Sequence, residues 1–227
     1  MKLSINQPAY IPWLGFFNRI YKSDIFVILD HVEFEKNSMI NRNKIKTNKG
    51  PLMLTVPLKT KGKFQNLAIN NIEIDNRSNW QRKHFNSICQ SYSKSKFFYK
   101  YYEFLENIYF KKWDKLIDLV NQLNLFILEE LKIETKILYS SQLSLNTKKS
   151  QLILDICKKF NAKTYLSGPF GKDYLDLNKF ESSEIKVEFH EYKQLNYDQL
   201  YGDFESHLSI IDLLFNCGPK SVDIIKL

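Results

Sequence analysis

The sequence predicts an α/β fold with a mostly parallel or mixed sheet, helices on both faces and a helical insertion. Short apolar segments alternate with amphipathic helical ones. The run Ile25–Leu29 is apolar throughout and is bounded by Asp24 and Asp30, as expected for a central strand covered on both faces. Between about residues 78 and 135 the pattern is helical only. With 227 residues and 44% apolar side chains, we expect one domain over 1–227.

The first elements form a strand, a rigid turn, a helix and a second strand. Leu3–Gln7 reads as a short strand. Pro8 and Pro12 each fix their own φ and disfavour helix in the residue before them, so an extended turn follows. A helix is expected over Leu14–Lys22, and it leads into the strand Ile25–Leu29.

A basic segment follows, Lys36–Lys63, which holds eight Lys and Arg residues and no acid. We interpret its first part as a loop. Leu52–Leu58 and Ile69–Ile74 are predicted as strands, and Lys59–Lys63 as the turn between them.

The sequence then predicts three helices, followed by a second α/β block. Ser78 is a candidate N-cap for a helix carrying Trp80, and Phe97–Tyr109 and Lys115–Leu131 are two further helices. Their many aromatic side chains are typical of a helix packing on a sheet. The expected C-terminal elements are a helix Lys149–Phe160, a strand Thr164–Leu166, a Gly-rich loop Ser167–Gly171, a strand Ile185–Phe189 and a helix Ser209–Phe215 with Ser209 as its N-cap.

Charge and composition restrict the classes of function. Residues 1–100 carry 17 Lys and Arg against 6 Asp and Glu, whereas residues 101–227 carry 16 against 19. The positive half would attract a phosphate-bearing ligand, but no familiar RNA-binding or DNA-binding motif accompanies it. No apolar run approaches the roughly 18 residues of a membrane span, and the N-terminus lacks the core of a secretion signal, so we expect a cytoplasmic protein. The three widely spaced cysteines are expected to be free thiols, and no zinc pattern is present.

Several polar residues are candidates for a site. Asp30 ends a strand and could orient a sugar hydroxyl or an amine, with His31 beside it as a proton carrier. Arg42 is a planar charged fork suited to a phosphate or carboxylate. The candidate substrate-binding residues are Gln7, Tyr10, Trp13, Lys36, Asn41, Arg42, Asn43, Lys46, Ser167, Gly168, Asp173 and Tyr174.

Structural roles for these residues remain open. Asp30 could cap a helix or a turn, Arg42 could pair with Glu33 or Glu35, and Trp13 could belong to the core. The lone histidines outside the first segment, His84, His190 and His207, are interpreted as structural or solvent-exposed.

Motifs in chain order resemble the WbqC-like protein family over nearly the whole chain. They are Gln7-Pro8, Pro12–Phe17, Phe26–Asp30, Val32–Phe34 with Lys36, Asn41–Asn43, Thr55–Leu58, Tyr165–Gly168, and Phe204 with Leu208–Asn216. The resemblance implies a bacterial cytoplasmic protein linked to surface polysaccharides such as the O-antigen of lipopolysaccharide. This chain departs from the family pattern at two places, with Asn6 where His or Met is frequent and His31-Val32-Glu33 where Asp-Val-Gln is usual.

Three functions fit these ingredients. The first is transfer of an acyl or aminoacyl group to the amine of a nucleotide-linked amino sugar, with an aminoacyl-tRNA as one donor class and the basic segment holding the pyrophosphate. The second is an adenylate-forming ligase or nucleotidyltransferase, which needs ATP and Mg²⁺, but the chain has Pro12–Gly15 in place of a His-x-Gly-His signature. The third is a non-catalytic module that binds a sugar nucleotide or a partner protein. No cofactor is assigned beyond the second function.

Overall fold

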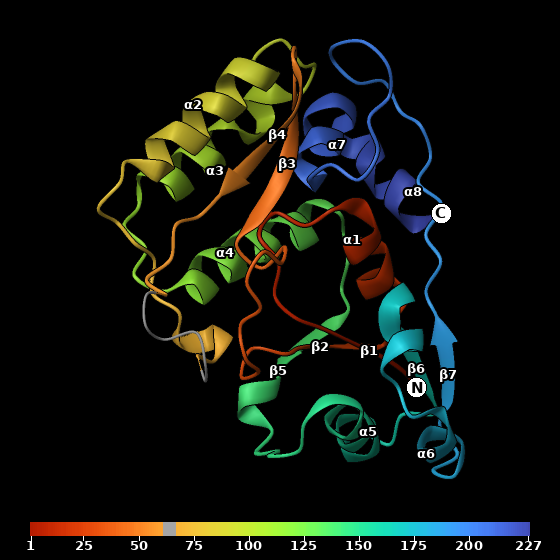
Figure 1. The fold of residues 1–227 in the computed structure, drawn as a ribbon. Coiled ribbons are helices and arrows are strands. Elements are labelled where there is room, and N and C mark those ends of the chain that lie inside the picture. The colour runs from red at the N-terminus through yellow and green to blue at the C-terminus, as the bar shows by residue number, and fades with distance from the viewer. Residues whose placement is uncertain (61–66) are drawn as a thin grey trace.

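The computed structural model describes residues 1–60 and 67–227, and its centre is a five-stranded sheet (Figure 1). Every neighbouring pair of these strands is parallel, and the spatial order is β5-β2-β1-β6-β7. The strands are β1 (Lys2–Asn6), β2 (Ile25–Ile28), β5 (Lys136–Tyr139), β6 (Thr164–Ser167) and β7 (Lys186–Phe189). The predicted α/β class with a parallel sheet is therefore confirmed.

The sheet is doubly wound, because the chain starts in its middle and extends it in both directions. It runs from β1 to β2 and β5 on one side, and then returns to β6 and β7 on the other. The order reverses between β1 and β6. In open parallel sheets of this kind, ligands bind outside the carboxyl ends of the strands at such a reversal.

Helices cover both faces of the sheet, as the sequence predicts. On one face Leu3, Ile5 and Val27 pack in a core with α5 (Lys149–Lys159) and α6 (Leu177–Glu181). On the other face Phe26 and Ile28 join a larger core with α1 (Leu14–Tyr21) and α4 (Leu116–Glu130). Alternating side chains on β2 thus pack into two different cores, which explains why the run Ile25–Leu29 is apolar throughout.

Additional elements extend the larger core away from the sheet. A hairpin of β3 (Arg42–Thr47) and β4 (Gly50–Thr55) packs beside α2 (Trp80–Tyr92), and α2 packs on α3 (Phe98–Phe110). Near the C-terminus, α7 (Ile210–Cys217) joins the same core and α8 (Ser221–Lys226) packs against α1 (Figure 1). Ser209 Oγ accepts a hydrogen bond from Ile211 N–H, so the predicted N-cap of α7 is confirmed.

Five expectations about local structure require correction. Ser78 is not the N-cap of α2, because the helix begins at Trp80 and Asn79 occupies that position. Arg42–Thr47, predicted as loop, is a strand because Asn48 and Lys49 form a tight turn and Gly50 adopts a φ of 100°. The predicted strand Leu52–Leu58 ends at Thr55, since Val56 N–H donates to Asn41 O outside the hairpin ladder.

Ile69–Ile74, predicted as a strand, begins as a 3₁₀-helix at Ile69–Asn71 and forms only isolated bridges at its end. The Gly-rich loop contains a 3₁₀-helix, Pro169–Asp173. The predicted turn Lys59–Lys63 extends into residues outside the described ranges. The sequence reasoning missed β5, α6 and α8. These elements have four to six residues and are partly exposed, so their apolar patterns are weak.

The cysteines are free, as predicted: Cys157 is buried, and Cys89 and Cys217 are half-buried. Within residues 1–60 and 67–227, no helix combines the length and apolar character that crossing a bilayer requires.

Candidate functional site

The parallel strands bring polar residues together at one edge of the sheet. Gln7 follows β1, Asp30 and His31 follow β2, Ser140 follows β5, Ser167 and Gly168 end β6, and His190 follows β7. All five strands run in the same direction, so their carboxyl ends share this edge (Figure 1). We refer to it as the carboxyl edge. Adjacent parallel strands lie about 4.8 Å apart, so groups that end neighbouring strands are close.

Asp30 is held by two serines that follow β5. Its side chain is 4% exposed, and both carboxylate oxygens accept hydrogen bonds. Ser140 Oγ donates to Oδ1 (3.0 Å), and Ser141 donates to Oδ1 from its N–H (2.8 Å) and to Oδ2 from its Oγ (2.6 Å). Asp30 therefore caps the 3₁₀-helix Ser140–Gln142, and its charge is stabilised by three donors. Burial and the neighbouring Asp30 charge raise the pKa of Tyr139.

Ser140 connects Asp30 to His31. The His31 Nδ1 atom lies 2.6 Å from Ser140 Oγ, and the imidazole is half-buried. The hydroxyl has a single proton, and the carboxylate can only accept, so Ser140 donates to Asp30. His31 must then donate its Nδ1–H to Ser140, so that in the neutral form of the imidazole the lone pair lies on Nε2. This arrangement fixes the tautomer in which Nε2 can accept a proton.

Ser140 was missed by the sequence reasoning. The two predicted catalytic residues, Asp30 and His31, are adjacent in sequence, but their link runs through a serine 109 residues beyond the histidine. The signal that could have revealed it is the polar pair Ser140-Ser141 directly after the apolar Ile137–Tyr139. A half-buried edge strand gives a weak apolar pattern, and β5 was not predicted for this reason.

A second missed residue is Arg19 on α1. Its side chain is 7% exposed, and it lies among apolar residues of a helix whose Leu14–Ile20 are all buried. Its Nη1 occupies the space beside Gly168, only 2.4 Å from where a Cβ on that glycine would be. Across the described parts of the chain, no carboxylate lies within 4 Å of the guanidinium and no hydrogen bond from it is formed. Burial lowers the pKa of Arg19, opposed by the nearby Tyr165 and Tyr174.

His190 ties α1 to the end of β7. Its Nε2–H donates to Asn18 Oδ1 (2.7 Å), while Asn18 Nδ2 donates to Ile225 O (2.6 Å) on α8. Burial lowers the pKa of His190 to about 4, and repulsion from Arg19 and Lys22 adds to the shift. The imidazole is therefore neutral at pH 7. This part of the carboxyl edge thus combines two cations with a neutral histidine.

The Gly-rich end of β6 places its predicted residues in different environments. Ser167 is fully buried and its Oγ donates to Gly168 O (3.0 Å). Tyr174 is 51% exposed, and Phe170 in the same 3₁₀ segment is 77% exposed. Asp173 is exposed. Two flat rings are thus available to a ligand next to Gly168, whereas Ser167 is covered.

The N-terminal turn is held by buried contacts. Tyr10 has no exposed surface, and its hydroxyl lies 2.9 Å from His84 Nδ1 and 2.5 Å from the Tyr109 hydroxyl. Trp13 is half-buried and stacks on His207 with ring centroids 5.0 Å apart. These contacts place Tyr10 in the core and leave part of Trp13 accessible. Burial lowers the pKa of His84 to about 4, so this predicted structural histidine is neutral.

The predicted Asn-Arg-Asn cluster supports this turn. Ile11 has a φ of 37°, which a β-branched residue seldom adopts. Asn43 Nδ2 donates to Ile11 O (2.9 Å), and Asn41 Nδ2 donates to Val56 O (2.8 Å). Arg42 Nη1 donates to Asn37 Oδ1 (3.4 Å), and Nη2 also bonds the Asn37 carbonyl. None of these contacts joins the cluster to Asp30 or His31.

Lys46 belongs to a separate buried network around Asp212. The Lys46 ammonium donates to Gln199 Oε1 (3.0 Å) and to Asp203 O (2.5 Å). Asp212 is unexposed and accepts hydrogen bonds from Tyr92, Tyr197 and Gln199 at 2.8–2.9 Å. Burial raises the pKa of Asp212, opposed by these three donors. Lys36, which is also predicted to bind substrate, is exposed, whereas Lys46 is buried. Lys36 has an interaction partner as well.

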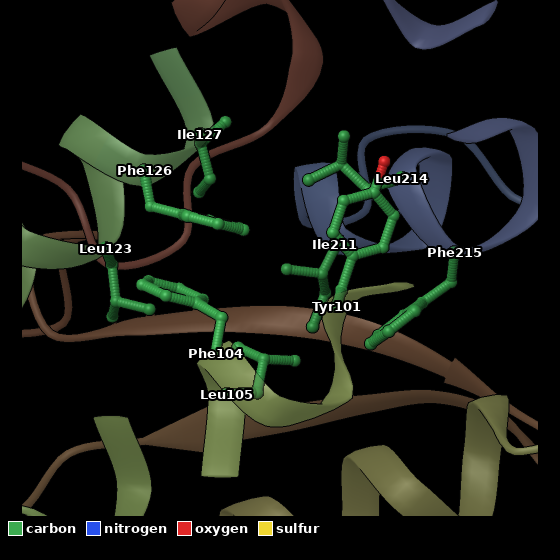
Figure 2. A pocket seen from close by; sticks show the side chains of 9 residues that line it. All are labelled: Tyr101, Phe104, Leu105, Leu123, Phe126, Ile127, Ile211, Leu214 and Phe215. Carbon is green, nitrogen blue, oxygen red and sulfur yellow. The ribbon is translucent and has the colours of Figure 1, made fainter. Parts of the chain in front are cut away.

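Two hollows in the described parts of the protein lie away from these residues. One has a volume of about 10 Å³ and is lined by apolar side chains of α3, α4 and α7, with Phe104 stacked on Phe126 (Figure 2). It is a packing gap of the core. A shallow one of about 440 Å³ lies between α5 and α6. Neither contains a predicted site residue, and over residues 1–60 and 67–227 no three His, Cys, Asp or Glu residues cluster as metal ligands.

Comparisons with known proteins agree with the motifs in the sequence. The family model described as "WbqC-like protein family" matches residues 7–224. A protein of Mycobacterium tuberculosis (strain ATCC 25618 / H37Rv), described as "Uncharacterized protein Rv1507c", is 34% identical over 227 residues. The match covers 99% of this chain and 97% of that relative. No solved structure matches the chain significantly.

Proposed function

Because this chain belongs to the WbqC-like protein family, we propose that it is a cytoplasmic enzyme of bacterial surface-polysaccharide biosynthesis, of the O-antigen type. Its proposed reaction is transfer of an acyl or aminoacyl group to the amine of a nucleotide-linked amino sugar. The observation that supports this reaction best is the chain of contacts from Asp30 through Ser140 to His31. It ends in an imidazole nitrogen that can accept a proton, at the carboxyl edge of a doubly wound sheet.

In the proposed reaction, the sugar amine attacks the carbonyl carbon of a thioester or an aminoacyl ester. A C–N bond forms as the C–S or C–O bond of the donor breaks. His31 Nε2 takes the proton that the amine loses and returns one to the departing thiolate or alkoxide. Asp30 and Ser140 act as positioning residues, since they hold His31 in the required tautomer.

The other predicted residues have supporting parts in this proposal. Gln7 is half-buried at the end of the central strand and offers an amide to the substrate. The cations of the first 100 residues, Lys36 and Arg42 among them, attract an anionic sugar nucleotide over a distance. Trp13 is half-buried, so part of this residue is accessible to a substrate.

The sheet order supports a second candidate, an ATP-dependent ligase or nucleotidyltransferase. A parallel sheet that starts in its middle and reverses at β1 and β6 is the arrangement of nucleotide-binding α/β folds. In that reaction the same edge would hold ATP with Mg²⁺. A non-catalytic module would bind the sugar nucleotide at this edge without turnover.

Product analysis separates these functions. The purified protein is incubated with an amino-sugar nucleotide, an acyl or aminoacyl donor (thioester or aminoacyl-tRNA), and ATP with Mg²⁺, in separate combinations, and products are identified by mass spectrometry. An amide product without ATP supports transfer. AMP release contradicts simple transfer and supports the ligase, while binding without any turnover supports the module.

Variants then test the residues. A general base contributes about 10²–10⁴-fold to rate, so His31→Gln should lower kcat by that factor. Gln90→Asn is the control, because Gln90 is exposed on α2 and is not among the predicted site residues. Ser140→Ala should lower kcat with little change in KM, and Ser140→Thr, which keeps the hydroxyl, should restore it. A His31→Gln variant with normal kcat would rule out the proposed base.

A further inference from the structure

We propose that Arg19 binds the pyrophosphate of a nucleoside diphosphate at the point of the carboxyl edge where the strand order reverses. The phosphate contact is inferred from the structure alone. The identity of the anion as a nucleoside diphosphate rests on the proposed function. The site lies on α1 and the end of β6, away from the basic segment that the sequence suggests for this role.

The first observation is that Arg19 is a largely buried cation with no carboxylate within 4 Å in the described ranges, and none of its nitrogens is a fully enclosed atom lacking a hydrogen bond. Removing a guanidinium from water is expensive unless a hydrogen-bonded anion compensates it. Lys46, the other buried Lys or Arg side chain among the described residues, donates to Gln199 and to a backbone carbonyl and lies near the Asp212 carboxylate. Arg19 has no comparable partner in the described ranges, although its side chain is equally covered. An external anion that bound here would supply a counter-charge for the guanidinium.

The second observation is the position of the guanidinium. Its Nη1 lies against Gly168, the residue that follows β6, and the absence of a Cβ there makes the approach feasible. Figure 1 shows α1 beside the segment that leaves β6. The strands β1 and β6 are the pair between which the sheet order reverses. A planar fork of N–H donors at this place matches the oxygens of a phosphate group.

The third observation is the chemistry around Arg19. Burial lowers the pKa of His190, and the charges of Arg19 and Lys22 lower it further, so both cations lie near this imidazole. The exposed rings of Phe170, in the 3₁₀-helix after Gly168, and of Tyr174, at its end, can stack on a nucleobase. The combination of a phosphate receptor with flat rings fits a nucleotide better than an isolated phosphate.

The strand order also relates Arg19 to His31. Since β2 and β6 are both neighbours of β1, their ends lie about 10 Å apart. A nucleotide whose pyrophosphate contacts Arg19 would therefore direct the attached sugar along the carboxyl edge towards His31. In this arrangement Arg19 binds the nucleotide and His31 transfers the proton.

Binding measurements test the proposal without requiring turnover. Isothermal titration calorimetry with uridine diphosphate is performed on wild-type protein and on Arg19→Met. Loss of charge-assisted hydrogen bonds of this kind weakens binding about 10–100-fold. Arg82→Met, which removes an exposed arginine of α2, is the matched control and should leave the affinity unchanged. Equal affinity of wild type and Arg19→Met would overturn the proposal.

A second variant moves the guanidinium without removing it. In Gly168→Ala the new Cβ would lie 2.4 Å from Nη1, so Arg19 must shift, and binding should weaken. Unfolding of the unliganded protein supplies a further criterion. Arg19→Met should be close to wild type in stability, because the guanidinium forms no ion pair or hydrogen bond in the described ranges and methionine keeps much of the apolar stem. A destabilised Arg19→Met with wild-type affinity would show a structural role and refute the site.

The probes and variants distinguish this proposal from the proposed reaction. Inorganic pyrophosphate that binds as tightly as uridine diphosphate, with no effect of Tyr174→Ala, would refute the nucleotide part. His31→Gln should bind uridine diphosphate normally. If binding depends on Arg19 but no amide product forms with any donor, the anion site is supported and the transfer reaction fails.

Discussion

The acid stability of this protein should depend on His190. The wild-type imidazole has its pKa lowered from 6.5 to about 4 by burial and by the charges of Arg19 and Lys22. In the unfolded chain it binds a proton below pH 6.5, whereas in the folded protein it stays neutral until about pH 4. The unfolded state therefore gains protons first as the pH falls. Stability is full above about pH 6.5 and decreases as the pH falls towards 4.

The size of the effect follows from the two pKa values. Between pH 7.5 and 4.5, protonation of one such histidine in the unfolded state costs about 2.5 kcal/mol of folding free energy. The side chain is only 7% exposed, so solvent screening reduces this figure little. His190→Gln removes the titration but keeps an amide donor that can reach Asn18 Oδ1. The wild type should therefore lose about 2.5 kcal/mol more than the variant over this range.

Urea denaturation followed by circular dichroism at several pH values measures this difference. His84 and the carboxyl groups also titrate, but they are present in both proteins and cancel in the comparison. Parallel curves of stability against pH for wild type and His190→Gln would refute the reasoning. Arg19→Met should raise the pKa of His190 and reduce the acid sensitivity, since one of the two repelling cations is gone.

Two further predictions concern the buried networks. Asp212→Ala leaves the three donors Tyr92, Tyr197 and Gln199 without their acceptor and removes the carboxylate near the Lys46 ammonium, so unfolding free energy should fall by about 3–5 kcal/mol, measured by urea denaturation. Asp223→Ala, at an exposed site of α8, should change it little, and equal effects of the two would contradict the network. Asn43→Ala should cost about 1–3 kcal/mol because the carbonyl of Ile11 loses its donor. A loss below about 0.5 kcal/mol would mean that Ile11 needs no such support.

The contacts of the polar motifs in the first 46 residues could not be predicted from the sequence, for one shared reason. Asn41, Asn43 and Lys46 carry the groups that bind ligands, and the same groups satisfy backbone carbonyls when they are buried. Residue type cannot separate the two uses. Burial decides between them, and burial depends on the whole fold.

The sequence by itself determined the α/β class, the central strand Ile25–Leu29, most helices and the family, because apolar periodicity and short motifs are local properties. It also placed Asp30 at a strand end. Only the tertiary structure decided that Ser140 links Asp30 to His31 and that the Arg19 guanidinium lies beside Gly168. These contacts join residues more than a hundred positions apart, and they exist because parallel strands bring their carboxyl ends to one edge.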